Sequence, residues 1–525
     1  MRHLVKNKIH IFFLLVYSFL ATYLHSFNSI RFDNTSIHSD NAVFYLMGKA
    51  ILDGKVLYKD IFDHKTPYIY FINALASMFD KNHVGLFIIT SIVLFISLYF
   101  TYKIVRLFTD NLYLALLAST FISLFLNNAN ITLGFLRTEG YAIALLLPSA
   151  YLFLKFFLSD EKRFKLSHIY LIGILAGLNL FINVKASILY VPFAISVLVV
   201  LINYKNIKNI VLCFVFGLAG VVVASLPAII YVVNNNCINE AVDAIFRINS
   251  IYSYYDSSVN SFHESKLETI LTVARMHPIL TSIIVIELLC IALYKTKKSI
   301  KLPTLFSFLL CLSYTIFVNR PYTYYYTIII PYLIPVCLLA IRKVECLNSK
   351  LMTNGDKGTA TGNDNTSHFF KVIVVILFLG IFILNFYIGF FVVNRRYENN
   401  VDTRKILNDM LKKEIDINDE TKVLSFGFSP EYYMFLNEKL SYKYFIIPNI
   451  KFEYYDTPYL EQINYVKNAL PDVLIFSFGD YTTQLPKRYF DEFKNAVNSN
   501  YKYLGDMLIY TNTDVNPKVL VRKQN

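Results

Sequence analysis

Long apolar runs, separated by short polar stretches, are the dominant pattern along this chain. A helix needs about 20 predominantly apolar residues to cross a bilayer. Eleven runs come close to that length, and the pattern therefore predicts a polytopic α-helical membrane protein. The runs cover about residues 9–27, 84–107, 111–127, 138–158, 168–184, 186–204, 209–233, 276–294, 302–318, 323–342 and 369–393.

Basic residues gather in alternate connections between these runs. Cytoplasmic loops of membrane proteins carry an excess of Lys and Arg, so these connections and the basic N-terminus are expected in the cytoplasm. Eleven crossings then place the end of the chain on the outer side. The basic residues that follow this pattern include Arg2, Lys6, Lys8, Lys162, Arg163, Lys165, Lys205, Lys208, Lys295, Lys297, Lys298, Lys301, Arg342, Lys343, Lys350, Lys357 and Lys371.

Three regions differ from the apolar runs. Residues 28–83 form a long outer loop with mixed charges, and residues 346–367 are rich in Gly, Thr and Asn, which predicts a flexible cytoplasmic linker. From residue 396 onward the chain has the composition of a soluble domain. We therefore expect a transmembrane domain at 1–395 and an extracytoplasmic α/β domain at 396–525.

Short apolar runs and the spacing of apolar residues predict strands and a helix in this C-terminal domain. Residues 423–428, 471–479 and 503–510 are short apolar runs typical of buried strands. Residues 459–470 have apolar positions at helical spacing.

Composition supports lipid as the solvent for most of the chain. Of the 525 residues, 55% are hydrophobic and 17% are charged, whereas soluble proteins have about 25% charged residues. The net charge of +13 is spread over loops and is not collected on a soluble module, which argues against a nucleic-acid partner. The six cysteines show no Cys-x-x-Cys spacing and predict neither a disulfide framework nor a metal site.

The outer loop at 28–83 concentrates the candidate chemistry. Apolar residues from Ala42 to Leu52 recur at spacings of three and four, which predicts a short helix on the membrane surface, with Asp40 as its N-cap and Gly54 at its end. Residues 67–79 are too few for a span and predict a second interfacial helix. The polar residues between the two helices include Tyr58, Asp60, Asp63, His64 and Lys65.

This loop resembles the first outer loop of the GT-C superfamily of membrane glycosyltransferases. The protein mannosyltransferases, the aminoarabinose transferases and related bacterial cell-surface sugar transferases are the most similar types. The loop departs from the family pattern in having Asn41 after Asp40 and Thr66 after Lys65. The matching positions are Asp40, Tyr45, Gly54, Tyr58, Asp60, Lys65 and Pro67.

The resemblance implies transfer of a sugar, with inversion, from a polyprenyl-phosphate donor to a hydroxyl of a glycan, lipid or protein. It implies Asp40 as general base and Lys65 as a phosphate contact, with Asp60 and Asp63 orienting the acceptor. Such a transfer needs a base for the hydroxyl proton and a fixed cation for the leaving phosphate. No cofactor is firmly implied, although a divalent cation at Asp40 and Asp63 is an open alternative. Tyr58 and His64 complete the expected substrate site.

Structural roles remain open for the same residues. Asp40 would then only cap its helix, and Lys65 would extend along the interface with its amine in water. Asp60, Asp63 and His64 would lie in a solvated loop.

Charged residues near the ends of other spans extend the candidate site. Arg137 and Glu139 precede and begin the fourth span, Lys185 lies between the fifth and sixth, and Arg320 follows the ninth. The resemblance implies substrate contacts for these residues, with Lys185 as a second phosphate ligand. Structural ion pairs are the alternative. Glu287 lies within the eighth span, where a carboxylate is costly and often functional.

Two other classes of function stay open. A lipid-linked glycan transporter or flippase typically has two related halves and charged sites at the bilayer midplane. A non-enzymatic membrane assembly protein would use the outer domain to bind a partner. The low-GC character of the composition and the resemblance together predict a bacterial plasma-membrane location, in contact with membrane lipids.

Overall fold

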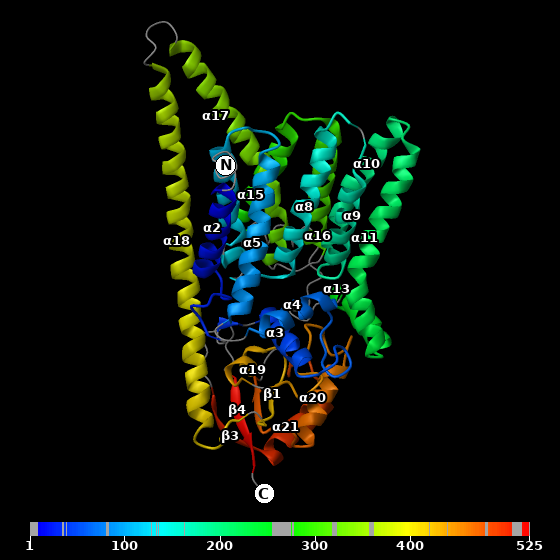
Figure 1. Cartoon of the computed structure of the whole chain (residues 1–525). Helices are drawn as coiled ribbons and strands as arrows, with labels where there is room; N and C mark the ends of the chain where they lie inside the picture. Colours follow the sequence, from blue (N-terminus) through cyan, green and yellow to red (C-terminus); the bar gives the residue numbers. More distant parts are fainter. Residues whose placement is uncertain are drawn as a thin grey trace. The chain divides into compact units, whose positions relative to one another are not determined.

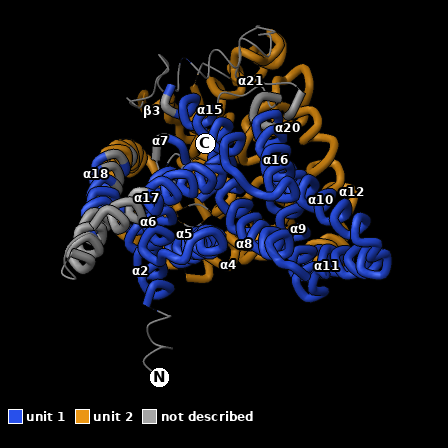
Figure 2. Tube along the Cα trace, turned by 90° about the horizontal axis from the view of Figure 1, so that it is seen from above, with its two compact units in different colours: residues 1–26, 87–227, 264–393 blue, residues 27–86, 228–263, 394–525 orange. Residues whose placement is uncertain are grey.

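The computed structural model of the chain forms two compact units, each assembled from three segments (Figure 2). The first contains residues 1–26, 87–227 and 264–393, and the second contains residues 27–86, 228–263 and 394–525. The structure describes residues 9–523 except 34–35, 38, 80–82, 128, 133, 135, 162, 255–274, 276–277, 318–322, 356–361, 419, 438, 478–480 and 507–516.

The first unit is a bundle of apolar helices packed side by side (Figures 1 and 2). Two of them, α11 and α18, continue into the second unit. The elements are α2 (Ile9–His25), α5 (Val84–Val105), α6 (Leu112–Leu126), α7 (Ala129–Thr132), α8 (Thr138–Leu158), α9 (Leu166–Leu180), η3 (Ala186–Tyr190), α10 (Val191–Asn203), α11 (Ile207–Asn234), α15 (Pro278–Leu293), α16 (Lys298–Phe317), η5 (Thr323–Tyr332), α17 (Leu333–Gly355) and α18 (Gly362–Leu411).

These helices are apolar outside as well as inside. Leu98 and Phe308 are fully buried in the bundle, whereas Phe214 on α11 is 71% exposed and Leu293 on α15 is 69% exposed. Within the described residues, five helices are long and apolar enough to cross a membrane. An outer surface of this kind is stable in lipid, and the chain is an integral membrane protein.

The predicted spans fall mostly on helical residues, but α17 and α18 extend far beyond the last two of them, to Gly355 and Leu411. How many of these helices cross the bilayer stays a prediction, because several are shorter than a bilayer requires. The predicted linker 346–367 is helical at both ends, since α17 extends to Gly355 and α18 begins at Gly362. Helix α18 also continues past the expected domain boundary at 395/396, and that boundary stays a prediction.

Close helix contact in the bundle depends on glycine. A Cβ atom on Gly173 of α9 would lie 2.2 Å from the carbonyl oxygen of Gly217 on α11. Gly177 follows four residues later and meets α11 in the same way. This is the small-residue spacing by which membrane helices bring their backbones together.

The second unit places two helices of the outer loop beside a four-stranded sheet (Figure 1). The sheet has the order β1-β2-β4-β3, with β1 and β2 parallel and the other two pairs antiparallel. Its elements are α3 (Ser39–Leu52), α4 (Pro67–Ser77), α12 (Ile238–Val242), η4 (Asp243–Ile248), α13 (Asn249–Tyr254), β1 (Val423–Ser425), α19 (Glu431–Phe435), α20 (Thr457–Lys467), β2 (Val473–Phe476), α21 (Lys487–Asn500), β3 (Tyr501–Asp506) and β4 (Lys518–Arg522).

The sheet has its own hydrophobic core. Leu424, Leu474 and Leu520 come from three neighbouring strands and are buried against Tyr459 of α20 and Phe493 of α21. The sequence pattern located β1, β2, β3 and α20 but did not indicate α19, α21 or β4. Strand β4 has only five residues, and its pairing with β2 and β3 is a long-range contact.

Candidate active site

The N-terminal end of α3 is held by a carboxylate from a distant part of the chain. The backbone N–H of Ser39 donates to the side chain of Glu431, the first residue of α19. Burial raises the pKa of Glu431 to about 7. The helix begins at Ser39, so Asp40 lies inside its first turn and is not the N-cap that the sequence predicts. Gly54, with φ +84°, follows the end of the helix as expected.

Helix α3 packs closely on α4. A Cβ atom on Gly48 would lie 2.5 Å from the backbone nitrogen of Ala74 and 2.8 Å from the Cβ atom of Asn73. Most side chains of α3 are buried, including Val43, Phe44 and Met47. This packing fixes α3, and with it Asp40, relative to the loop that precedes α4.

That loop is organised around the buried carboxylate of Asp63, which is 5% exposed. Its Oδ1 accepts the backbone N–H of His64 at 2.8 Å and lies 3.1 Å from Nδ1 of the same ring. Its Oδ2 accepts the hydroxyl of Tyr70 at 2.7 Å. Burial alone would raise the pKa of Asp63, but its interactions with His64, Lys65 and Tyr70 hold it well below its usual range.

The same network fixes the tautomer of His64. Lys65 Nζ lies 3.0 Å from Nε2 of His64. Because an ammonium group only donates, Nε2 must accept and the ring proton must sit on Nδ1, facing Asp63. Asp63, His64 and Lys65 thus form a continuous chain from a buried carboxylate to an amine. The Asn249 amide also donates to the carbonyl of His64, at 2.6 Å.

Tyr252 of α13 packs against the end of this chain. Its ring centroid lies 4.6 Å from that of His64, and Lys65 Nζ lies 5.1 Å from the ring centroid. The Lys65 amine therefore has an imidazole and an aromatic face as neighbours.

A pocket of about 340 Å³, counting its open side, brings these groups together with Asp40. The rest of its lining comes from α3 and from the chain beyond β1. Beside the latter, the Ile447 N–H donates to the carbonyl of Gly427 at 2.8 Å. The carboxyl ends of parallel strands are common ligand sites because loops there converge. The lining residues are Asp40, Val43, Phe44, Asp63, His64, Lys65, Tyr252, Phe428, Pro448 and Asn449.

Two other predicted residues of the loop shape its backbone. Tyr58 is buried at φ +67°, and its hydroxyl donates to the carbonyl of Lys65 at 2.8 Å. Asp60 is exposed and accepts the backbone N–H of Val56 at 2.8 Å. The Tyr58 hydroxyl thus holds the backbone of Lys65 in place. Asp60 closes a turn and does not line the pocket.

The remaining predicted residues belong to the first unit. Arg137 and Glu139 are 5% and 3% exposed and line a second cavity of about 590 Å³, counting its open side. The Arg137 guanidinium carbon lies 4.0 Å from the ring centroid of Tyr324, and Glu139 accepts from Asn183 at 3.4 Å. Lys185 precedes η3 and lines neither cavity. Arg320 lies outside the described residues.

A divalent cation at Asp40 and Asp63 stays a prediction. Both oxygens of Asp63 already accept hydrogen bonds. Among the residues that the structure describes, no group of three or more His, Cys, Asp or Glu side chains is arranged to hold a metal ion.

Comparison with known proteins now gives the family. Residues 2–399 match the family model described as the putative competence-induced protein Ccs4 N-terminal domain. The chain belongs to this family. The description of the family names no reaction, and a search of the curated proteins finds no match to this chain.

Solved structures show the fold of this family member. The crystal structure of ArnT from Cupriavidus metallidurans bound to undecaprenyl phosphate superposes with a TM-score of 0.52 at 12% identity, covering 98% of this chain and 97% of that one. The same enzyme in the apo state has a TM-score of 0.48 at 10% identity, covering 99% and 98% of the two chains. An Archaeoglobus fulgidus oligosaccharyltransferase has a TM-score of 0.45 at 11% identity, covering 93% and 71%. The chain therefore has the fold of ArnT.

Four residues of the site escaped the sequence analysis as site residues. Tyr70 and Asn249 anchor the Asp63–His64 segment, Glu431 holds α3, and Asn449 lines the pocket and accepts from the hydroxyl of Tyr481. No local pattern marks them, because each reaches the site through a tertiary contact. Only the position of Tyr70, five residues after Lys65 on the same predicted loop, gave any signal.

Proposed function

We propose that this chain transfers a sugar from a polyprenyl-phosphate donor to a hydroxyl acceptor at the outer membrane face, with inversion. The observation that carries the proposal is that Asp40, Asp63, His64 and Lys65 line one pocket. The likeness to ArnT, whose crystal structure holds undecaprenyl phosphate, supports this class of donor.

In the proposed reaction Asp40 takes the proton of the acceptor hydroxyl. The acceptor oxygen forms a bond to the anomeric carbon of the sugar, on the face opposite the phosphate. The bond from that carbon to the phosphate oxygen breaks, and its electron pair leaves on the polyprenyl phosphate. The charge that develops there is stabilised by the Lys65 ammonium group.

The Asp63–His64 chain keeps this ammonium group in place. A lysine side chain in water samples many rotamers, and holding it beforehand removes that entropy from the transition state. Tyr252 lies beside the same amine and offers an aromatic face to a sugar ring. Arg137 and Glu139, buried in the other unit, remain proposed substrate contacts, as do Lys185 and Arg320.

The test uses the purified full-length chain in proteoliposomes with a panel of polyprenyl-phosphate sugars and hydroxyl acceptors. The readout is release of free polyprenyl phosphate. Asp40→Asn should reduce turnover at least about 100-fold, the usual contribution of a general base. Asp53→Asn is the matched control, because Asp53 is exposed just after the other end of α3.

A second matched pair tests the cation. Lys65→Gln should lower turnover, whereas Lys59→Gln, an exposed lysine in the same loop, should not. If no donor is turned over, and lipid binding is the same in wild type and Asp40→Asn, the transferase proposal fails. A lipid-linked glycan transporter or an assembly protein would then be the better description.

A further inference from the structure

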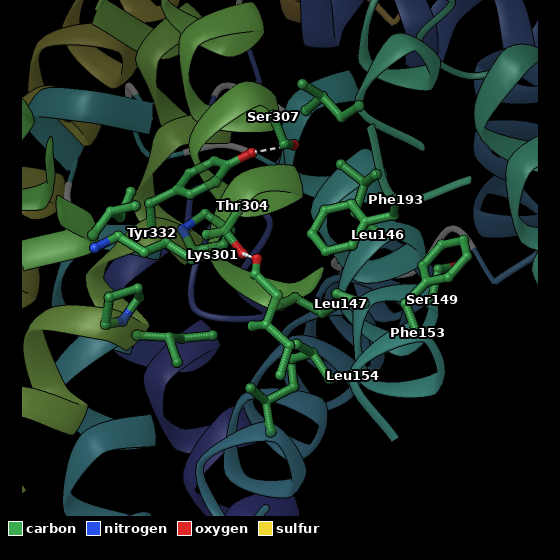
Figure 3. Close-up of a pocket in the computed structure, with 18 of the residues that line it drawn as sticks. Leu146, Leu147, Ser149, Phe153, Leu154, Phe193, Lys301, Thr304, Ser307 and Tyr332 are labelled. Carbon is green, nitrogen blue, oxygen red and sulfur yellow. Dashed lines mark hydrogen bonds between the residues drawn. The ribbon is translucent and has the colours of Figure 1, made fainter. Parts of the chain in front are cut away.

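The first unit contains a large apolar cavity that the proposed reaction does not use. It encloses about 1020 Å³ of empty space, counting its open mouth. Leu146, Phe153 and Phe193 lie on one side and Lys301 and Tyr332 on the other (Figure 3). The Tyr332 hydroxyl and Ser307 are hydrogen-bonded to each other on the wall.

The cavity lies toward one end of the bundle. It is lined by Ile104 and Phe108 at the end of α5, by Tyr294 just after α15, and by Ile300 and Lys301 at the start of α16. The connections at these ends are those that the distribution of basic residues assigns to the cytoplasm. Walls of this kind disfavour water, and apolar cavities in proteins stay dry. A hydrocarbon chain from the adjoining leaflet fits them.

Cations surround the mouth of this cavity. Lys301 is itself part of the lining, and its amine donates to the carbonyl of Ala292 at the end of α15. The Arg342 guanidinium carbon lies 4.2 Å from the ring centroid of Tyr294, another lining residue, and its Nη1 donates to the carbonyl of Lys295 at 3.0 Å. Lys301 is therefore part of the cavity wall, and Arg342 packs on the ring of Tyr294, which also lines the cavity.

The other charged groups at this end leave the mouth positive. Lys297 Nζ donates to the carbonyl of Phe157 at 3.4 Å, and Lys298 is exposed beside it. The acidic side chain of Glu345 is also at this end and accepts the hydroxyl of Thr109 at 2.5 Å. Basic pockets between helices on the cytoplasmic side are the usual sites for anionic lipid head groups.

A polar group inside the mouth is also unsatisfied. The Tyr294 residue is 4% exposed, and its hydroxyl is buried with no hydrogen-bond partner among the described residues. A buried hydroxyl without a partner costs about 1–3 kcal/mol, and a phosphate or ester oxygen would accept its proton.

We propose that this cavity binds an anionic phospholipid of the cytoplasmic leaflet. One acyl chain occupies the apolar walls, and the phosphate lies between Lys301 and Arg342, beside the Tyr294 hydroxyl. Charge complementarity selects this occupant over a zwitterionic lipid. The site does not depend on the proposed transfer reaction.

The test uses the full chain in detergent, with dioleoyl phosphatidylglycerol or dioleoyl phosphatidylcholine added and bound lipid counted by native mass spectrometry. Wild type should retain phosphatidylglycerol preferentially. The double variant Lys301→Gln/Arg342→Gln should bind it roughly 25-fold more weakly, at about 5-fold for each basic residue near the head group. Arg163→Gln/Lys165→Gln removes the same charge from the α8–α9 connection and should change nothing.

A second variant tests the acyl-chain portion. Ala150→Phe places a ring in the cavity and should abolish retention, whereas Ala194→Phe, on the exposed side of α10, should not. Thermal unfolding without added lipid checks that each variant is folded, and either variant alone decides the case if the other does not fold. Equal retention of the two phospholipids overturns the proposal. So does displacement of phosphatidylglycerol by equimolar undecaprenyl phosphate, which would assign the cavity to the donor.

Discussion

Replacing Asp63 by Asn tests whether one buried, charged carboxylate stabilises the loop that forms the candidate site. The native side chain is 5% exposed. It accepts hydrogen bonds from the His64 N–H and the Tyr70 hydroxyl and lies 3.1 Å from His64 Nδ1. Asparagine keeps one acceptor oxygen but turns an NH₂ group toward groups that donate. Breaking a buried charged network by removing one partner costs about 3–5 kcal/mol, and we expect Asp63→Asn to destabilise the loop by that amount.

Two measurements on the full chain in detergent test this expectation. Thermal unfolding reports the global effect, and hydrogen exchange of residues 62–70 reports local opening of the loop. Asp60→Asn is the matched control, because Asp60 is exposed and its carboxylate accepts the Val56 N–H in a turn. A surface change of this kind should stay within about 0.5 kcal/mol.

The pH dependence has a definite sign. The pKa of Asp63 is lower in the folded chain than its ordinary value of 3.8. The stabilisation is therefore complete above that value and is lost as the pH falls toward the folded pKa. The difference between wild type and Asp63→Asn should be constant at neutral pH and shrink only in strong acid. If Asp63→Asn and Asp60→Asn unfold at the same temperature with equal exchange at 62–70, the carboxylate does not anchor the site.

Three further predictions concern single residues. Burial raises the pKa of Glu431 to about 7, so the stability that its proton provides is lost as the pH rises from about 4.5 to about 7. Glu431→Gln should make the unfolding temperature less dependent on pH over this range. A pH dependence equal to that of wild type would contradict the prediction. Gly48→Val would force α3 away from Ala74 and should cost about 1–3 kcal/mol, with Gly380→Val, where a Cβ meets nothing within 4 Å, as the control. Glu287 is fully buried on α15, and neither of its oxygens has a hydrogen-bond partner among the described residues; Glu287→Leu should raise the unfolding temperature in lipid, and a lower one would point to a polar partner.

The sequence by itself determined the class of protein and the loop that carries the candidate site. Apolar runs of near-bilayer length can be buried only in lipid, so their positions follow from composition alone. The outer loop was recognisable because Asp40, Tyr58 and Lys65 lie close together in the chain, and local spacing is what a sequence displays. Helix α3 followed from local periodicity, and α4 followed from an apolar run too short to span a bilayer.

Only the tertiary structure decided how that loop works. Asp60 and Asp63 are three residues apart and look alike in sequence, yet one is exposed in a turn and the other is buried under Tyr70. Glu431 reaches Ser39 across nearly 400 residues of chain. Burial and long-range hydrogen bonds set the charge and orientation of a side chain, and neither is encoded in the spacing of neighbouring residues. The sequence therefore identified the candidate residues, while folding assigned each of them its surroundings.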